Sequence, residues 1–252
     1  PLPQSVVHSW GLAIQQQLSK NVALEVGYQG SHAVHEFTVQ EANDARVGTG
    51  ARQQRRPALR MAIKPGERRL QILQALAAML ESPEADRITT AALATHLDVS
   101  EAALYRHFAS KAQMFEGLIE FIEHSLFTLA NQILEREPEP AAQIARIVTA
   151  LLQFAEKNPG MGRVLAGDAL VFEHARLNQR ILQCLERLES LLRQPARALA
   201  EVRGSQAPTV EAQARASAAI SLVLGRWQRH VRTGFTRKPT EHLDATLRLL
   251  LA

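Results

Sequence analysis

The sequence TTAALATHLDVSEAALYRHFASK, residues 89–111, decides the fold. Leu93 and Leu97 are four positions apart and predict the apolar face of one short helix. Leu104 and Phe108 repeat this spacing and predict a second short helix that packs against the first. Two short helices joined by a tight turn are typical of a helix-turn-helix, whose second helix lies in the major groove of DNA.

The turn and the start of the second helix are polar. Asp98 and Val99 form the turn, and Ser100 is placed to cap the second helix, because a serine hydroxyl accepts from amides of the first helical turn. Glu101 follows in that turn, where the helix dipole favours a negative charge. The side chains that remain on the outer face are Ala102, Tyr105 and Arg106, with His107 at its edge.

Charge does not by itself favour DNA in this part of the chain. The 252 residues carry a formal net charge of +4, but residues 64–111 are balanced. The basic residues there are Lys64, Arg68, Arg69, Arg87, Arg106 and Lys111, and the acidic ones are Glu67, Glu81, Glu84, Asp86, Asp98 and Glu101. Any affinity for DNA must therefore come from where the charges lie.

The sequence contains none of the motifs that would indicate a disulfide, a metal site or an enzyme active site. Cys184 is the one cysteine, so an internal disulfide and a cysteine-based zinc site are excluded. His124, His174, His230 and His242 lack metal-ligand spacing, and neither a nucleophile elbow nor a glycine-rich phosphate loop occurs. We therefore expect no enzyme activity, cofactor or metal site. No apolar run has the length of a membrane span and no signal-peptide layout is present, so we expect a cytoplasmic protein without a membrane partner.

Residues 1–60 differ from the rest of the chain in composition and in hydrophobic periodicity. Apolar residues alternate with small or polar ones over residues 22–28, a strand-like period of two, and residues 10–32 resemble a strand-turn-strand fragment of an outer-membrane β-barrel. Residues 41–60 are polar and rich in arginine. We predict a largely disordered extension, which is not native if translation begins at Met61.

The alternative for this extension is a basic arm. Its arginines would then contact DNA phosphates. These arginines are Arg52, Arg55, Arg56 and Arg60. Similarly, Lys64, Arg68 and Arg69 at the start of the next helix either contact phosphates or form an ordinary solvated helix end.

Helical periodicity continues from residue 66 to the end of the chain, with proline and glycine as breakers. The expected helices span residues 66–82, 110–137, 141–156, 161–166, 170–194, 209–232 and 240–251. Pro195 is expected to end or kink the fifth of these. Ala214, Ala218, Leu222 and Gly225 form a face of mostly small residues that lets another helix approach closely.

These residues resemble the TetR family of DNA-binding proteins. The resemblance rests on residues 88–94, 99–108 and 110–111. Within the family, residues 72–74, 79–82, 114–123 and 158–160 match best the bacterial nucleoid occlusion factors, and the similarity covers residues 66–192 well. The resemblance implies an all-α fold with a helix-turn-helix DNA-binding domain, residues 61–111, and a helical dimerisation and partner-binding domain, residues 112–252, after the extension of residues 1–60.

The resemblance also implies the function. A homodimer, joined by its last two long helices, would bind a pseudo-palindromic site on double-stranded DNA. Bound to such chromosomal sites, it would antagonise the tubulin-like division protein FtsZ over the nucleoid. The alternative is a transcriptional repressor that a small ligand releases from DNA.

Site residues follow position by position from the resemblance. The DNA-binding residues would be Thr89, Thr90, Ser100, Glu101, Ala102, Tyr105, Arg106, His107 and Lys111, with Lys111 on a flanking phosphate. Arg106 could pair with a guanine, contact a phosphate or be a solvated neighbour, and we favour the last two. The partner-binding residues would be Phe121, Lys157 and Asn158. Leu129 stands where the family has an arginine, and Asp98 replaces the usual glycine of the turn, where it must adopt a left-handed conformation.

Overall fold

The computed structural model describes residues 6–19, 22–34, 65–82 and 88–252. Two strands and nine α-helices are formed in these ranges. The first helices are α1 (Pro65–Leu80), α2 (Thr90–His96) and α3 (Glu101–Tyr105), which we call the head. The others, which we call the body, are α4 (Lys111–Arg136), α5 (Pro140–Lys157), α6 (Pro159–Leu165), α7 (Ala175–Val202), α8 (Pro208–Arg232) and α9 (Leu243–Leu251), with a 3₁₀ turn at Asp168–Leu170.

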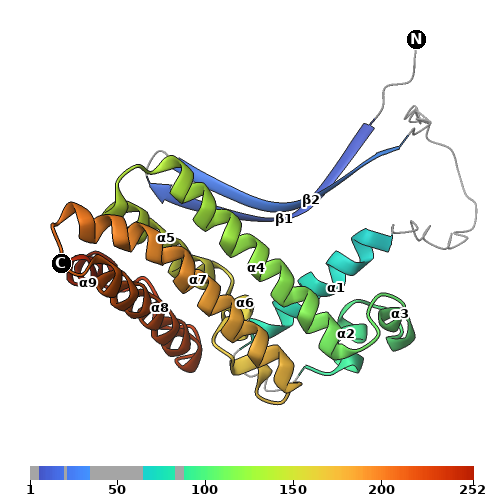
Figure 1. The fold of residues 1–252 in the computed structure, drawn as a ribbon. Helices are drawn as coiled ribbons and strands as arrows, with labels where there is room; N and C mark the ends of the chain where they lie inside the picture. The colour runs from blue at the N-terminus through green and yellow to red at the C-terminus, as the bar shows by residue number, and fades with distance from the viewer. Residues whose placement is uncertain (1–5, 20–21, 35–64, 83–87) are drawn as a thin grey trace, which may run out of the picture.

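The helices match the all-α fold predicted from the sequence. In Figure 1 the head lies at one end of the long helix α4, and α5, α7 and α8 pack along the rest of the body. None of the helices in the described ranges is long and apolar enough to cross a membrane.

A hairpin precedes the helices. Strands β1 (Val6–Ser19) and β2 (Val22–Val34) pair in antiparallel register, with Val6 opposite Val34 and Ile14 opposite Val26. The alternation over residues 22–28 thus did predict a strand. Residues 35–64 lie outside the described residues. The predicted disorder of the extension, its arginine arm, the start at Met61 and the role of Lys64 therefore stay predictions.

The turn between α2 and α3 is built around a left-handed aspartate. Asp98 has φ 51°, the left-handed conformation expected from the glycine that the TetR family has at this position. The Asp98 amide donates to the Thr95 carbonyl at 3.1 Å, and the Val99 amide donates to the Ala94 carbonyl at 3.0 Å. This pair of bonds is a Schellman motif, which ends α2 and turns the chain into α3.

Asp98→Gly should therefore stabilise the protein by roughly 0.5–1 kcal/mol, because glycine adopts the left-handed conformation without a Cβ clash. The urea midpoint should rise while the slope of the transition stays the same. Asp98→Ala is the matched control and should lower the midpoint. If the glycine variant is less stable than the parent, backbone strain is not the main cost at this turn.

The N-caps of α3 and α4 differ. Ser100 is the N-cap residue of α3, as predicted, but its side chain makes no capping hydrogen bond. Ser110 caps α4, since its hydroxyl accepts from the Gln113 amide at 3.2 Å. The Gln113 side chain in turn accepts from the Ala109 amide at 2.9 Å, one residue before the cap. The cap thus also fixes the link between α3 and α4.

Helix α7 does not end at Pro195. It continues for two more turns, to Val202, with Pro195 buried inside it. Proline removes one helical hydrogen bond. Apolar residues on both sides of it, Leu192, Ala196 and Leu199, are buried where α7 packs against α8, and this packing outweighs the lost bond.

The body has one continuous apolar core. Trp227 is fully buried and donates from Nε1 to the Leu151 carbonyl at 3.0 Å, so it belongs to the core of the protomer. Cys184 lies on the buried face of α7. Burial raises the pKa of its thiol to about 12, and the charge of Glu123 adds to this shift.

Helix α6 joins the body to the head. A Cβ on Gly160 would lie 2.0 Å from the backbone oxygen of Ala77 in α1, so the two helices cross in backbone contact. Arg163, 6% exposed, donates to the Ser82 carbonyl at 3.0 Å, just after the end of α1, and binds Asp168 at 2.7 Å. A cation at the end of a helix stabilises its free carbonyls.

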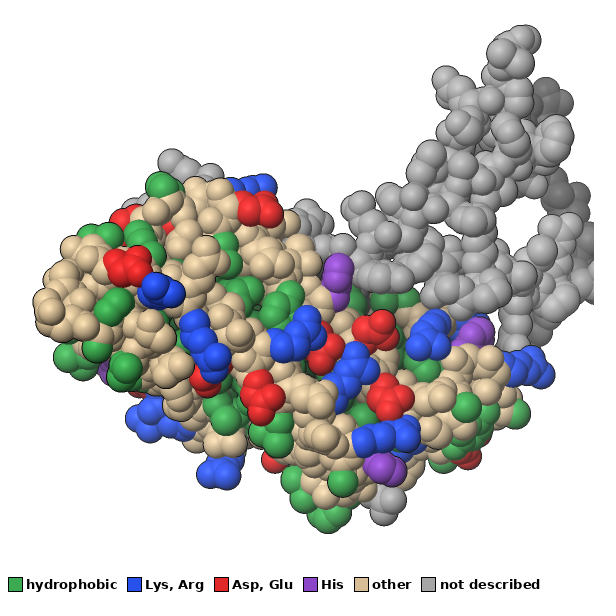
Figure 2. All heavy atoms as spheres, in the orientation of Figure 1, with side chains coloured by type: hydrophobic (Ala, Val, Ile, Leu, Met, Phe, Trp, Pro, Cys, Tyr) green, Lys and Arg blue, Asp and Glu red, His purple; other side chains and the backbone are tan. Residues whose placement is uncertain are grey.

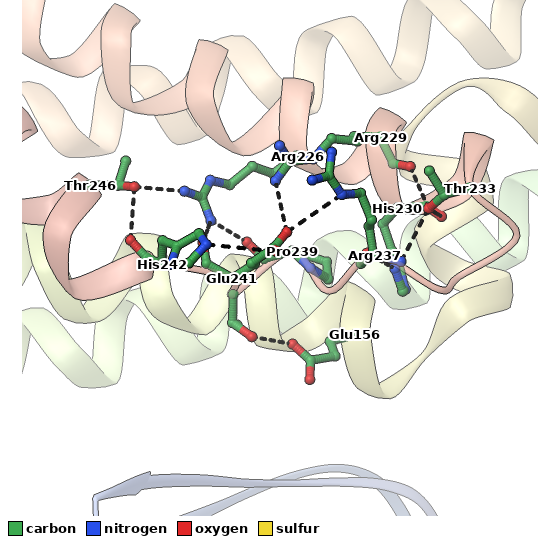
Figure 3. Close-up of polar contacts among 11 residues, drawn as sticks. Glu156, Arg226, Arg229, His230, Thr233, Arg237, Pro239, Glu241, His242 and Thr246 are labelled. Atoms are coloured by element: carbon green, nitrogen blue, oxygen red, sulfur yellow. Dashed lines mark hydrogen bonds and ion pairs between the residues drawn. The ribbon is translucent and has the colours of Figure 1, made fainter.

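The end of the chain is clamped onto the body by polar contacts (Figure 3). Arg226 in α8 donates to the carbonyls of Pro239 and Glu241, both at 2.6 Å, and to the Thr246 hydroxyl at 2.7 Å. Thr240 donates to Glu156 in α5 at 2.5 Å. These bonds hold α9 against α5 and α8.

The predicted small-residue face of α8 is at the surface of the protomer. Ala214, Ala218 and Gly225 are exposed, and Leu222 is half-buried. The face of α8 that packs within the chain is a different one, formed by Ala212, Ala216, Ala219, Val223 and Trp227. A Cβ on Gly225 would meet nothing within 4 Å, so another helix has room to approach there.

Candidate nucleic-acid interface

Hydroxyl groups gather where α2 and α3 meet. Thr89 is the N-cap of α2, and its hydroxyl accepts from the Ala92 amide at 3.1 Å. Thr90 donates to the Glu101 carboxylate of α3 at 2.6 Å. The Tyr105 hydroxyl lies 3.5 Å from the Thr90 oxygen, at the outer limit of a hydrogen bond. Four of the predicted DNA-binding residues therefore lie together.

The outer face of α3 is open to solvent. Tyr105 is 46% exposed, and Ser100, Ala102 and Arg106 are exposed as well. Leu104 and Phe108 are 1% exposed and attach the helix to the core. The division of this helix into a buried and an outward face is as predicted.

His107 lies at the edge of that face, where it is half-buried. Its carbonyl accepts from Arg69 at 3.2 Å, and the Arg69 guanidinium lies 4.2 Å from the centre of the Phe108 ring. Arg69 thus clamps the end of α3 to α1, a structural role that sequence spacing could not reveal. Arg68, Arg106 and His107 line an open cleft between α1 and α3.

Lys111 does not stand free for a phosphate. It forms an ion pair with Glu173, which lies just before α7, and the two side chains are only 21% and 11% exposed. Its ammonium also lies 5.6 Å from the centre of the Phe115 ring. Glu173 was missed by the sequence analysis, because a pairing across 62 positions leaves no local pattern.

Charged pairs continue from Lys111 along α4 and α7. Glu116 binds Arg176 at 2.7 Å, and Glu123 binds Arg180 at 3.0 Å. The hydrogen bond to Glu123 raises the pKa of Arg180 above its ordinary value. Acidic and basic side chains alternate across the surface where these helices lie (Figure 2). This face is therefore mixed in charge and offers no basic stripe to DNA.

The predicted partner residues lie on α4 and at the end of α5, and they differ in exposure. Phe121 is 7% exposed and Leu129 is 1% exposed, so both belong to the core of the protomer. Lys157 is exposed. Asn158 is half-buried and its amide group donates to the Phe154 carbonyl at 2.8 Å. Of the predicted set, Lys157 is the side chain most open to a partner.

Family models match three parts of the chain. Residues 72–118 match the model of bacterial regulatory proteins of the tetR family, and residues 139–252 match a tetracyclin repressor-like C-terminal domain. Residues 2–77 match a model described as an outer membrane beta barrel domain. The first two matches cover the head and most of the body.

Relatives of nearly full length are similar to the helical part. The nucleoid occlusion factor SlmA of Marinomonas sp. (strain MWYL1) is 51% identical over 181 residues, which are 72% of this chain and 91% of the relative. SlmA of Vibrio vulnificus (strain YJ016) is 50% identical over 190 residues, 75% of this chain and 96% of the relative.

A solved structure shares the fold. The transcriptional regulator FadR from Bacillus subtilis, in complex with stearoyl-CoA, superposes with a TM-score of 0.60 at 12% identity, covering 73% of this chain and 97% of that one. At this identity only the fold is compared. The helix-turn-helix geometry, the family models and the near 50% identity lead to one conclusion: the chain belongs to the TetR family, in the group of SlmA nucleoid occlusion factors.

Proposed function

We propose that this protein is a DNA-binding nucleoid occlusion factor, not an enzyme, that restrains assembly of FtsZ near the chromosome. The observation that carries the proposal is the exposed hydroxyl-rich face of α2 and α3, in a chain about half identical to SlmA proteins over nearly their whole length. Hydroxyl groups are suited to DNA phosphates and position a protein on the duplex. We assign the DNA contacts to Thr89, Thr90, Ser100, Tyr105 and His107.

The DNA-binding form in this proposal is a homodimer. The exposed small residues of α8 support it, together with Leu182 of α7, which is 58% exposed. An apolar surface on long neighbouring helices is suited to a second copy, because small side chains let two backbones approach closely. Two heads in such a dimer would read two half-sites of a pseudo-palindrome.

The FtsZ contact in this proposal lies at the end of α5, around Lys157 and Asn158. The exposed Lys157 side chain suits an acidic segment of the partner. Phe121 is buried in the protomer, so its part in binding requires either a local opening or an indirect role through packing.

Sedimentation of FtsZ polymers tests this function. Chromosomal fragments retained in an electrophoretic screen supply the specific DNA. With that DNA present, the protein should reduce the pelleted FtsZ at least about twofold, and Lys157→Glu should abolish this effect because it reverses the charge of the proposed contact.

Arg248→Glu is the control, since it makes the same charge change on exposed α9. It should act like the parent. If the DNA-bound parent leaves FtsZ polymers untouched, the division function fails. If a small ligand then releases the protein from its DNA, the ligand-controlled repressor replaces it.

A further inference from the structure

One short segment of the body contacts both the end of α1, in the head, and the start of α4, where the chain leaves the head. It runs from α6 through the 3₁₀ turn to Glu173, residues 159–173, and we call it the saddle. At its start, Gly160 touches the backbone of α1 and Arg163 binds the Ser82 carbonyl after that helix. At its end, Glu173 binds Lys111, the first residue of α4.

The two ties lie where α1 ends and where α4 begins, directly after the head. Arg163 acts where α1 ends, and Lys111 comes directly after the Ser110 cap that joins α3 to α4. Both ties are shielded from water, since Arg163 is 6% exposed and the Glu173 side chain is 11% exposed. Shielded ion pairs and charged hydrogen bonds have well-defined geometry, so they fix orientation better than exposed pairs do.

The burial of Glu173 also decides what Lys111 does. If a DNA phosphate drew Lys111 away, the Glu173 carboxylate would lose its partner in a place with little access to water. Leaving a shielded charge unpaired is costly, so the ion pair is expected to persist in the DNA complex. Lys111 then ties the start of α4, the residue that directly follows the link from the head, to the segment before α7, and it is not a phosphate contact.

We propose that Arg163 and Glu173, the latter through Lys111, are positioning residues that set the angle of the head on the body. In the dimer this angle fixes the distance between the two recognition helices, and thereby the spacing of half-sites that the protein accepts. The inference rests on the proposed DNA binding as a dimer. It assigns the choice of DNA spacing to residues that do not touch DNA.

Half-site spacing is the direct test. The probes are the fragment selected by the parent protein and copies of it with one or two base pairs inserted between the half-sites. Each inserted pair moves the second half-site by about 3.4 Å and rotates it around the duplex. The parent should bind the probe with one inserted base pair at least about 10-fold more weakly than the selected fragment. Glu173→Gln and Arg163→Met should bind these same two probes with affinities within about threefold of each other.

A charge exchange separates the tie from a phosphate contact. Lys111→Glu with Glu173→Lys keeps an ion pair but places a negative charge at position 111. We expect this variant to regain the spacing preference that Lys111→Glu alone loses. Arg163→Lys should likewise keep most of the preference that Arg163→Met loses.

Three results would overturn the proposal. One is that Glu173→Gln and Arg163→Met weaken binding to all spacings equally, which indicates a merely structural role. Another is that the charge exchange fails to restore binding and lowers the salt slope by about one, which identifies Lys111 as a phosphate contact. The last is that a control, Glu135→Gln at the far end of α4, changes the preference as much as Glu173→Gln. If the parent binds no pseudo-palindromic fragment, the proposed DNA function fails instead.

Discussion

We expect Gly160→Ala to lower the free energy of unfolding by about 3 kcal/mol, the upper end of the range for overpacking. The added Cβ would lie 2.0 Å from the Ala77 oxygen and 3.1 Å from the Leu80 Cβ. Backbone cannot move aside as a flexible side chain can, so α1 and α6 must separate along their whole contact. The head would then lose its fixed place on the body.

Thermal unfolding measures this effect, and the midpoint should fall by about 6 to 12 °C. Gly162→Ala is the matched control in the same helix. Its Cβ would lie 3.3 Å from the Ala155 Cβ, so a small shift relieves the contact and the midpoint should change far less. Equal unfolding temperatures for the two variants would show that Gly160 does not lie in backbone contact with Ala77 where α1 and α6 cross.

Tyr105→Ala with His107→Ala should weaken specific DNA binding at least roughly 100-fold, because each protomer loses two contacts of about 1–3 kcal/mol. Tyr105 lies on the outer face of α3 and His107, half-buried, at its edge, while Leu104 and Phe108 hold the helix in place. The clamp from Arg69 uses the His107 carbonyl, which remains after the substitution. The fold should therefore survive.

Titration of a labelled specific fragment, at one fixed salt concentration, gives the affinity, and circular dichroism checks the fold. His124→Ala, an exposed histidine in the body, should bind like the parent. Affinity retained in a folded double variant would remove α3 from the DNA interface.

Local patterns predicted the elements that carry the head. The apolar spacing of Leu93, Leu104 and Phe108 placed two helices correctly, and each of these side chains is buried. The resemblance to the TetR family, which has a glycine at position 98, predicted a left-handed residue there, and Asp98 adopts this conformation. Such features depend on neighbours within a few positions, so the sequence displays them directly.

Contacts between distant segments were not predictable in this way. Proline normally ends a helix, but the sequence does not show how firmly α8 packs on both sides of Pro195. Lys111 looked like a free cation because Glu173 lies 62 positions away. Arg163 likewise binds a carbonyl 81 positions earlier, and no pattern links the two. Tertiary packing decides these cases.

The burial of Cys184 makes the alkylation rate of its thiol a measure of how often the body opens. A thiolate is the reactive form of cysteine, and burial raises the pKa of the Cys184 thiol to about 12, so the thiol is overwhelmingly protonated near neutral pH. The same packing that suppresses ionisation also keeps reagents out. We therefore expect the rate of Cys184 alkylation to be limited by local opening of α7. A ligand that stabilises the body should lower this rate.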